Sequence, residues 1–148
     1  AEYWHQVIKI NDYQKNRFAQ KIINNFEGDL IGKKITILGW AFKANTNDSR
    51  ESPAIYVAEK LLRAGALLNI YDPMVSKEKI IEDLKKVIID KGCQSNITNK
   101  WLNRVTICLD LDSAIQGSNA LSVLTHWDEF KNNNWEILKN SNIPVFKT

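Results

Sequence analysis

The chain has 148 residues, which is enough for one domain with a real core and too few for two full domains. Its composition, 44% apolar and 25% charged, is that of an ordinary soluble protein, and no stretch approaches the roughly 20 apolar residues of a membrane span. The formal net charge is only +3 and the basic pairs Lys33-Lys34 and Lys85-Lys86 are isolated, so we expect neither nucleic acid nor a membrane as a partner.

The amino-terminal segment predicts a long amphipathic helix over residues 2–26. One face, at a period near 3.6, carries Trp4, Val7, Ile8, Phe18, Ala19, Ile22 and Phe26. Ile10 and Tyr13 lie off that face, so we expect cover on more than one side. Gly28 and Gly32 mark the helix end. The helix is either a connector or oligomer seam, or a plain packing helix, and its charged start is not that of a signal peptide.

Strands and helices alternate after this helix. We expect strands at 34–39, 67–71, 105–109, 120–124 and 143–146, helices near 53–64, 76–86 and 111–116, and short helical turns at 128–130 and 135–139. Residues 90–103 are polar and irregular, which predicts an insertion loop. The short, nearly all-apolar strands indicate burial on both sides. The sequence therefore predicts an α/β fold with a doubly wound parallel sheet, preceded by a long N-terminal helix.

Two cysteines, Cys93 and Cys108, do not make a disulfide framework, and a reduced cytoplasmic setting is the better interpretation. Cys108 lies in an apolar run and is expected to be a small core residue. A nucleophilic role for Cys93 is not favoured, because no histidine lies near it in sequence. His5 and His126 are far apart and have no further ligand at suitable spacing, so no metal site is expected.

The polar loop after the first strand is the best candidate for a functional site. It carries Lys43 and Arg50 toward the carboxyl end of the strand, where open α/β sheets bind phosphorylated ligands. The Gly-x-Gly-x-x-Gly turn of dinucleotide sites is absent, and bulky Trp40 and Phe42 follow Gly39 instead. A phosphate would therefore be met by side chains, with Lys43 as a point charge and Arg50 as a fork.

The alternative for both cations is an ordinary surface ion pair with Asp48 or Glu51. Asp72, at the end of the second strand, matches the position of a ribose-binding acid, but the following Pro73 favours a strand-end turn. Trp127, after the fourth strand, is either a flat wall for a base or a plug at the core edge. The pattern does not decide between these two roles.

Five segments together resemble the carboxyl-terminal part of the UDP-glucose 6-dehydrogenases. They are Asn11-Asp-Tyr-Gln-Lys-Asn-Arg17, Leu38-Gly-Trp-Ala-Phe-Lys43, Asp48-Ser-Arg-Glu-Ser-Pro53, Tyr71-Asp-Pro73 and Thr125-His-Trp-Asp-Glu-Phe130. The resemblance runs over nearly the whole chain and in the same order. These enzymes oxidise UDP-glucose to UDP-glucuronate with two NAD, using an amino-terminal NAD domain with a catalytic Cys, a central helix and a Rossmann-like UDP-binding domain.

The resemblance implies a connector and dimerisation helix at residues 1–28 and a UDP-binding domain at residues 29–148. Phe42 and Lys43 would contact the UDP-sugar, Arg50 would reach NAD, and residues 2–26 would form a homodimer seam. The resemblance places no catalytic residue in this chain, and NAD would be bound mostly by the absent NAD domain. We therefore expect a fragment that is inactive alone.

Some family features have no match in this sequence. The Gly-Gly-x-Cys nucleophile segment and the Asp-Gly-Arg after the final strand are absent, while Trp40 and His126 stand where Phe (or Leu) and Glu are more usual. A shortened cleft with weaker affinity is expected. Two alternatives remain: the same role in a GDP-mannose or UDP-N-acetylmannosamine dehydrogenase, or a non-catalytic dimerisation module. The Asn-Asp-Tyr-Gln and Thr-x-Trp-Asp-Glu-Phe segments favour UDP-glucose.

Overall fold

The computed structural model of the chain describes residues 2–131 and 143–147. Its helices are α1 (Glu2–Asn25), α2 (Pro53–Arg63), α3 (Lys77–Asp90), α4 (Ser95–Leu102), α5 (Leu111–Ile115) and α6 (Asp128–Lys131). Its strands are β1 (Lys34–Leu38), β2 (Leu67–Tyr71), β3 (Val105–Ile107), β4 (Ala120–Val123) and β5 (Val145–Lys147). Apart from the consecutive α3 and α4, strands and helices alternate from β1 onward.

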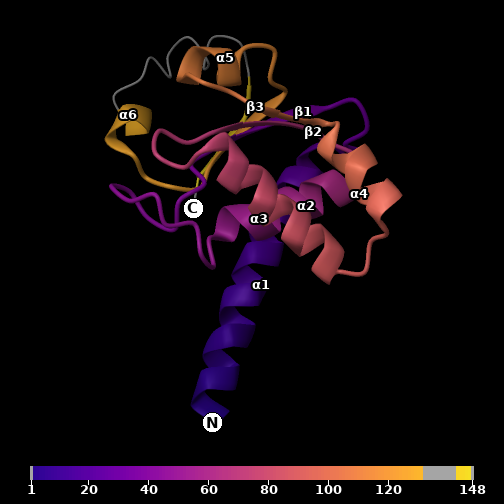
Figure 1. The fold of residues 1–148 in the computed structure, drawn as a ribbon, viewed down its shortest axis with the longest axis vertical. Coiled ribbons are helices and arrows are strands. Elements are labelled where there is room, and N and C mark those ends of the chain that lie inside the picture. The colour runs from indigo at the N-terminus through magenta and orange to yellow at the C-terminus, as the bar shows by residue number, and fades with distance from the viewer. Residues whose placement is uncertain (1, 132–142, 148) are drawn as a thin grey trace.

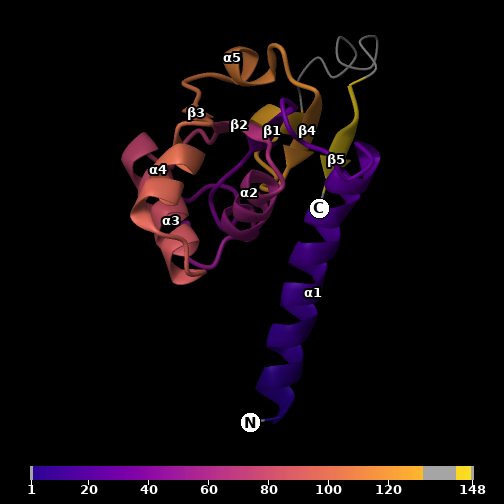
Figure 2. The same ribbon diagram turned by 90° about the vertical axis from the view of Figure 1, so that its right-hand side faces the viewer.

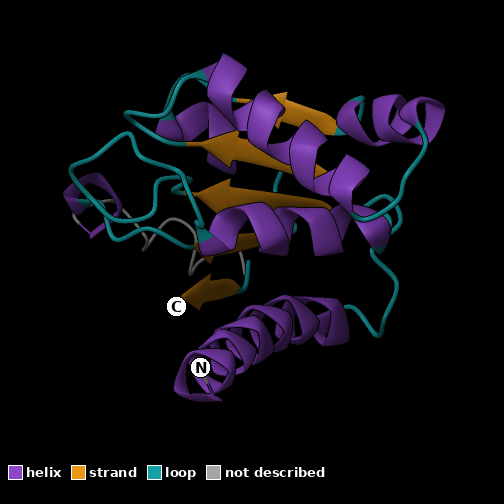
Figure 3. Cartoon of the chain, turned by 60° about the horizontal axis from the view of Figure 1, so that its bottom comes forward, coloured by secondary structure: helices purple, strands orange, loops and turns teal. Residues whose placement is uncertain are grey.

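The strands form one parallel sheet in the order β3-β2-β1-β4-β5. β1 lies at the centre, where Ile37 pairs with Ile70 of β2 on one side and with Ser122 of β4 on the other. The predicted α/β fold with a parallel sheet and a long N-terminal helix is therefore confirmed. Because the strands are parallel, their carboxyl ends meet at one edge, and Figure 3 shows the arrowheads pointing to the side where the following loops gather.

Helices lie on both faces of the sheet, with α5 on one side and α2 and α3 on the other (Figures 1 and 2). α2 begins where the sequence predicts: Ser52 is the N-cap, its side chain accepts from the amide of Ala54, and Pro53 takes the first helical position. The apolar stripe of α2 is buried against the sheet layer through Val57, Ala58, Leu61 and Leu62.

One predicted element is wrong: the expected insertion loop over residues 90–103 contains the helix α4. Only Thr98 of α4 is fully buried, so the segment has no apolar stripe that could reveal it. The expected last strand at 143–146 corresponds to β5 at Val145–Lys147. The helical turn expected at 135–139 lies outside the described residues.

The helix α1 has two different surroundings along its length. Its last turns pack beside α2 and bury Ala19, Ile22 and Ile23, whereas its first turns project away from the sheet (Figures 1 and 2). No helix in the described part of the chain has the length and apolar character that crossing a membrane requires.

Candidate functional site

The β1–α2 loop (residues 39–52) begins at Gly39, whose backbone lies close to the end of β2 on one side and to the segment after β4 on the other. The amide of Gly39 donates to the Tyr71 carbonyl at 2.8 Å, and Gly39 has a φ of +96°. A Cβ on Gly39 would lie 2.4 Å from Cβ of Thr125. Glycine is needed here both for the left-handed backbone and for the close approach of the segment after β4.

Asp72 anchors the start of this loop from the end of β2. Its carboxylate accepts hydrogen bonds at 2.7–3.3 Å from the amides of Trp40, Ala41, Met74 and Val75 and from the indole N–H of Trp127. The strand-end turn predicted for Asp72 is confirmed, because its oxygens are used by the protein itself. Trp127 is buried against this carboxylate, so it plugs the core edge.

The rest of the loop base is held by its own backbone and by Thr125. Thr125 Oγ1 donates to the Ala41 carbonyl at 2.7 Å, and the amide of Phe42 donates to the Asp48 carbonyl at 2.7 Å. Both backbone groups of Ala41 are therefore paired, which fixes the chain direction just before Phe42 and Lys43. Of the Thr125-His-Trp-Asp128 segment, Thr125 and Trp127 support the loop while His126 is exposed.

The loop presents Phe42 and Lys43 to solvent beyond this fixed base. The Phe42 side chain is 56% exposed, which is unusual for a phenylalanine in a compact domain. Lys43 is exposed and has no hydrogen-bond or ion-pair partner among the described side chains. The surface-pair alternative therefore does not describe Lys43.

Arg50 lies in the same loop but is engaged. Its guanidinium donates through Nε and Nη2 to the two oxygens of Asp48, each at 3.1 Å, and its amide donates to Asp48 Oδ1 at 3.0 Å. The Arg50 hydrogen bonds hold the pKa of Asp48 below its ordinary value, and Asp48 raises the pKa of Arg50. Both side chains are open to solvent, so a competing anion can reach the pair.

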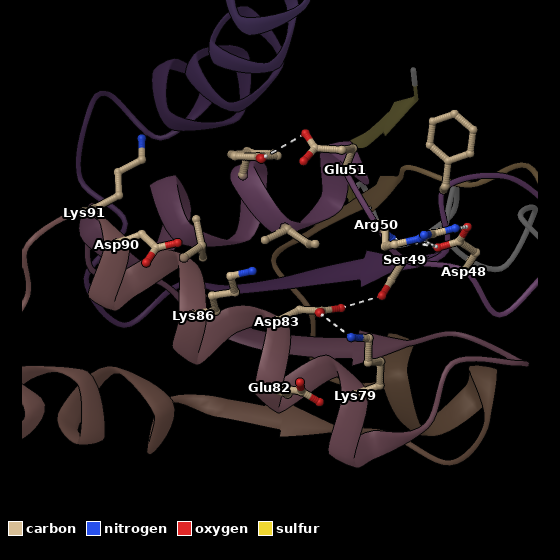
Figure 4. Close-up of a pocket in the computed structure, with 14 residues that line it drawn as sticks. Asp48, Ser49, Arg50, Glu51, Lys79, Glu82, Asp83, Lys86, Asp90 and Lys91 are labelled. Atoms are coloured by element: carbon tan, nitrogen blue, oxygen red, sulfur yellow. Dashed lines mark hydrogen bonds and ion pairs between the residues drawn. The ribbon is translucent and has the colours of Figure 1, made fainter.

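A groove of about 910 Å³ separates the far part of this loop from α3 (Figure 4). Its charged lining side chains are Asp48, Arg50, Glu51, Lys79, Glu82, Asp83, Lys86, Asp90 and Lys91. Five acids against four bases leave the lining as a whole without an excess of positive charge that would attract a phosphate. Lys43, which does not line the groove, and Arg50, which does, therefore remain the individual candidates for an anion. No cluster of three or more metal-ligating side chains occurs in the described part of the chain.

Sequence patterns did not reveal one residue that touches the loop. Asp83, on α3, accepts a hydrogen bond from the Trp40 indole and another from the Ser49 hydroxyl, and Figure 4 shows the one from Ser49. Its visible sequence signal is an i,i+4 pairing with Lys79, which indicates an ordinary helix-surface pair. The cysteines Cys93 and Cys108 are both free, and burial raises the pKa of Cys108.

Comparison with known proteins gives a family for this fold and loop. Residues 36–146 match the UDP-binding domain of the UDP-glucose/GDP-mannose dehydrogenase family. UDP-glucose 6-dehydrogenase 4 of Arabidopsis thaliana is 42% identical over 99% of this chain and 31% of its own length. The UDP-glucose 6-dehydrogenase of Gallus gallus is 45% identical over 92% of this chain and 26% of its own length.

A solved structure agrees with this match. The UDP-glucose dehydrogenase from Pyrobaculum islandicum superimposes with a TM-score of 0.68 at 26% identity, covering 95% of this chain and 27% of that one. The chain thus spans about a third or less of the relatives it matches. Fold, motif order and sequence identity agree, and the chain belongs to the UDP-glucose/GDP-mannose dehydrogenase family through its UDP-binding domain.

Proposed function

We propose that this chain is the UDP-sugar-binding part of a UDP-glucose 6-dehydrogenase, an enzyme that oxidises UDP-glucose to UDP-glucuronate with two NAD. The observation that carries the proposal is Lys43: an exposed cation without a partner among the described side chains, beside an exposed Phe42, on a loop with a rigid base. This loop lies in a domain that matches the family's UDP-binding domain.

In this proposal Lys43, Phe42 and Arg50 each have a different role. Lys43 supplies a mobile positive charge for a phosphate or sugar oxygen, and the exposed Phe42 ring supplies an apolar surface next to it. Arg50 offers two parallel N–H groups to the phosphates of NAD, which the rest of the enzyme binds. Asp48 already accepts hydrogen bonds from both of these N–H groups. A phosphate of NAD therefore has to displace the Asp48 carboxylate from the Arg50 guanidinium.

The helix α1 serves assembly in this proposal. A second copy of the chain covers its projecting turns and forms a homodimer. The buried Ala19, Ile22 and Ile23 pack the other end of α1 onto the sheet domain. The dimer interface on α1 therefore has a fixed orientation relative to the β1–α2 loop.

Calorimetric titration of the chain with UDP tests the assigned roles. Lys43→Ala is expected to weaken UDP binding about tenfold or more, because a hydrogen bond to a charged group contributes roughly 1.5–3 kcal/mol. Lys85→Ala, which removes an exposed lysine from α3, is the matched control and should bind as the unaltered chain does. Equal affinities for the unaltered chain and Lys43→Ala would contradict the role of Lys43, and tighter binding of GDP than UDP would favour a GDP-sugar enzyme.

A second assay tests the fragment interpretation. With UDP-glucose and NAD, this chain should show no NADH formation, since it carries no Gly-Gly-x-Cys nucleophile segment. Measurable turnover by the chain alone would contradict the proposal that oxidation takes place outside it.

A further inference from the structure

We propose that Asp83 is a positioning residue that holds the β1–α2 loop in the conformation that presents Lys43 and Arg50. This inference rests on the proposed function for its ligand. Asp83 lies on α3, far from the loop in sequence, and contacts no residue assigned to nucleotide binding. It acts through Trp40 and Ser49, which come before and after the segment that carries Lys43.

The contacts of Asp83 form a two-point attachment. Oδ2 accepts from the Trp40 indole N–H at 3.0 Å and from the Ser49 hydroxyl at 2.6 Å, as Figure 4 shows for Ser49. The donors are almost wholly buried, and the Asp83 side chain is only 12% exposed. Hydrogen bonds to a charged group in such surroundings are stronger than those on the surface, and a donor left without its acceptor is costly.

This attachment reaches a part of the loop that the other anchors do not contact. Asp72 and Thr125 bind the loop at Trp40 and Ala41, near its start. Ser49 stands directly before Arg50, so its bond to Asp83 fixes the end of the loop from which Arg50 projects. With both ends fixed, the segment between them has fewer conformations to lose when a ligand binds.

Lys79 offsets the negative charge of the Asp83 carboxylate, which would otherwise repel an anion at the neighbouring loop. Its Nζ lies 3.3 Å from Asp83 Oδ1, one helical turn away on α3. Lys79 thus pairs with Oδ1, while Oδ2 accepts the hydrogen bonds from Trp40 and Ser49. An asparagine at position 83 could keep an oxygen at the Oδ2 place, so the neutral variant separates hydrogen bonding from charge.

The test compares Asp83→Ala and Asp83→Asn with Arg104→Ala. Arg104 also donates two hydrogen bonds, to the carbonyls of Leu62 and Ala66, but at the carboxyl-terminal end of α2, away from the loop that precedes this helix. In the ligand-free chain, amide hydrogen exchange over residues 42–50 should become faster in Asp83→Ala. It should become faster to a smaller extent in Asp83→Asn, which keeps an acceptor but loses its charge, and should stay unchanged in Arg104→Ala.

UDP affinity supplies the functional measurement. Asp83→Ala should bind UDP about tenfold more weakly, since loss of preorganisation acts on affinity, while Asp83→Asn and Arg104→Ala stay within about twofold. Unchanged exchange over residues 42–50 in Asp83→Ala would overturn the inference. Faster exchange with unchanged UDP affinity would overturn the positioning role as well, leaving Asp83 a stabilising residue.

Further variants keep the test decisive if Asp83→Ala does not fold. Trp40→Phe and Ser49→Ala each remove one donor and leave the acceptor in place, and each should give part of both effects. If the unaltered chain does not bind UDP, the proposed function fails. The exchange comparison, which needs no ligand, then still decides whether Asp83 holds the loop.

Discussion

Asp72 connects the carboxyl ends of three strands through one side chain. It follows β2, binds two amides that follow β1, and accepts from the indole of Trp127, which follows β4. All of these donors are buried or partly buried, so each would be costly without an acceptor. The Tyr-Asp-Pro sequence predicts the local turn. Its partner 32 residues earlier could not be predicted, because that pairing is set by strand order.

Replacing Asp72 by alanine should therefore destabilise the fold strongly. We expect a loss of about 3 kcal/mol or more in the free energy of unfolding, because several buried donors lose a charged acceptor together. Urea denaturation of Asp72→Ala measures this loss. Asp90→Ala, at an exposed position on α3, is the control and should change stability by less than about 0.5 kcal/mol. A similar small change in both variants would contradict the anchoring role.

The ion pair between Asp48 and Arg50 predicts a titration. Carbon NMR of the Asp48 carboxyl should give a pKa below the ordinary aspartate value, and Arg50→Gln should return it toward that value. Because the folded-state pKa is depressed, the pair's contribution to stability is present above the ordinary carboxyl pKa. It is lost as the pH falls through the folded-state pKa. An unshifted Asp48 in the unaltered chain would show that the pair does not form in solution.

The junction of β1 with its loop depends on close contact as well as on backbone freedom. Gly39→Ala introduces a Cβ 2.4 Å from Thr125 at a φ of +96°, whereas Gly92 has a similar φ of +91° and nothing within 4 Å of an added Cβ. Gly92→Ala should cost about 1–2 kcal/mol from the left-handed backbone alone. Gly39→Ala should cost clearly more in thermal unfolding, and equal costs would rule out the contact with Thr125.

Among the elements, the sequence predicts those with a strong apolar pattern and misses the one without. β1 and α2 are buried along regular stripes, so periodicity and the Ser52-Pro53 start place them correctly. α4 is held instead in part by a contact that is distant in sequence: the guanidinium group of Arg63, on α2, lies 5.5 Å from the Trp101 ring centre. Such contacts depend on the fold and leave no local signal.

At the level of the whole molecule, contacts with the sheet domain do not explain what stabilises the first turns of the long helix α1. Its first turns project from the body, and the sequence places apolar residues there. A helix of this kind is stable when another surface covers it. We therefore expect sedimentation velocity to give a particle of twice the 17.0 kDa chain mass at micromolar concentration. A monomer under those conditions would contradict the seam assigned to α1.

The candidate site shows the same division between local and long-range information. Motif spacing predicts that Lys43 and Arg50 follow β1 on a polar loop, and the structure places them there. The sequence offers Asp48 or Glu51 as an ion-pair partner for either cation. It does not show that Asp48 pairs with Arg50 while Lys43 stays without a partner among the described side chains. Nor does it identify Asp83, since the contact of α3 with the loop arises only when the layers pack.

The central claim is that a nucleotide binds at the β1–α2 loop through Lys43. The most direct measurement is amide NMR of the chain during titration with UDP. The account predicts that the largest chemical-shift changes fall on residues 42–50 and that Lys43→Ala removes most of them. Shifts that are absent, or that lie mainly on α4 and α5 and persist in Lys43→Ala, would contradict it.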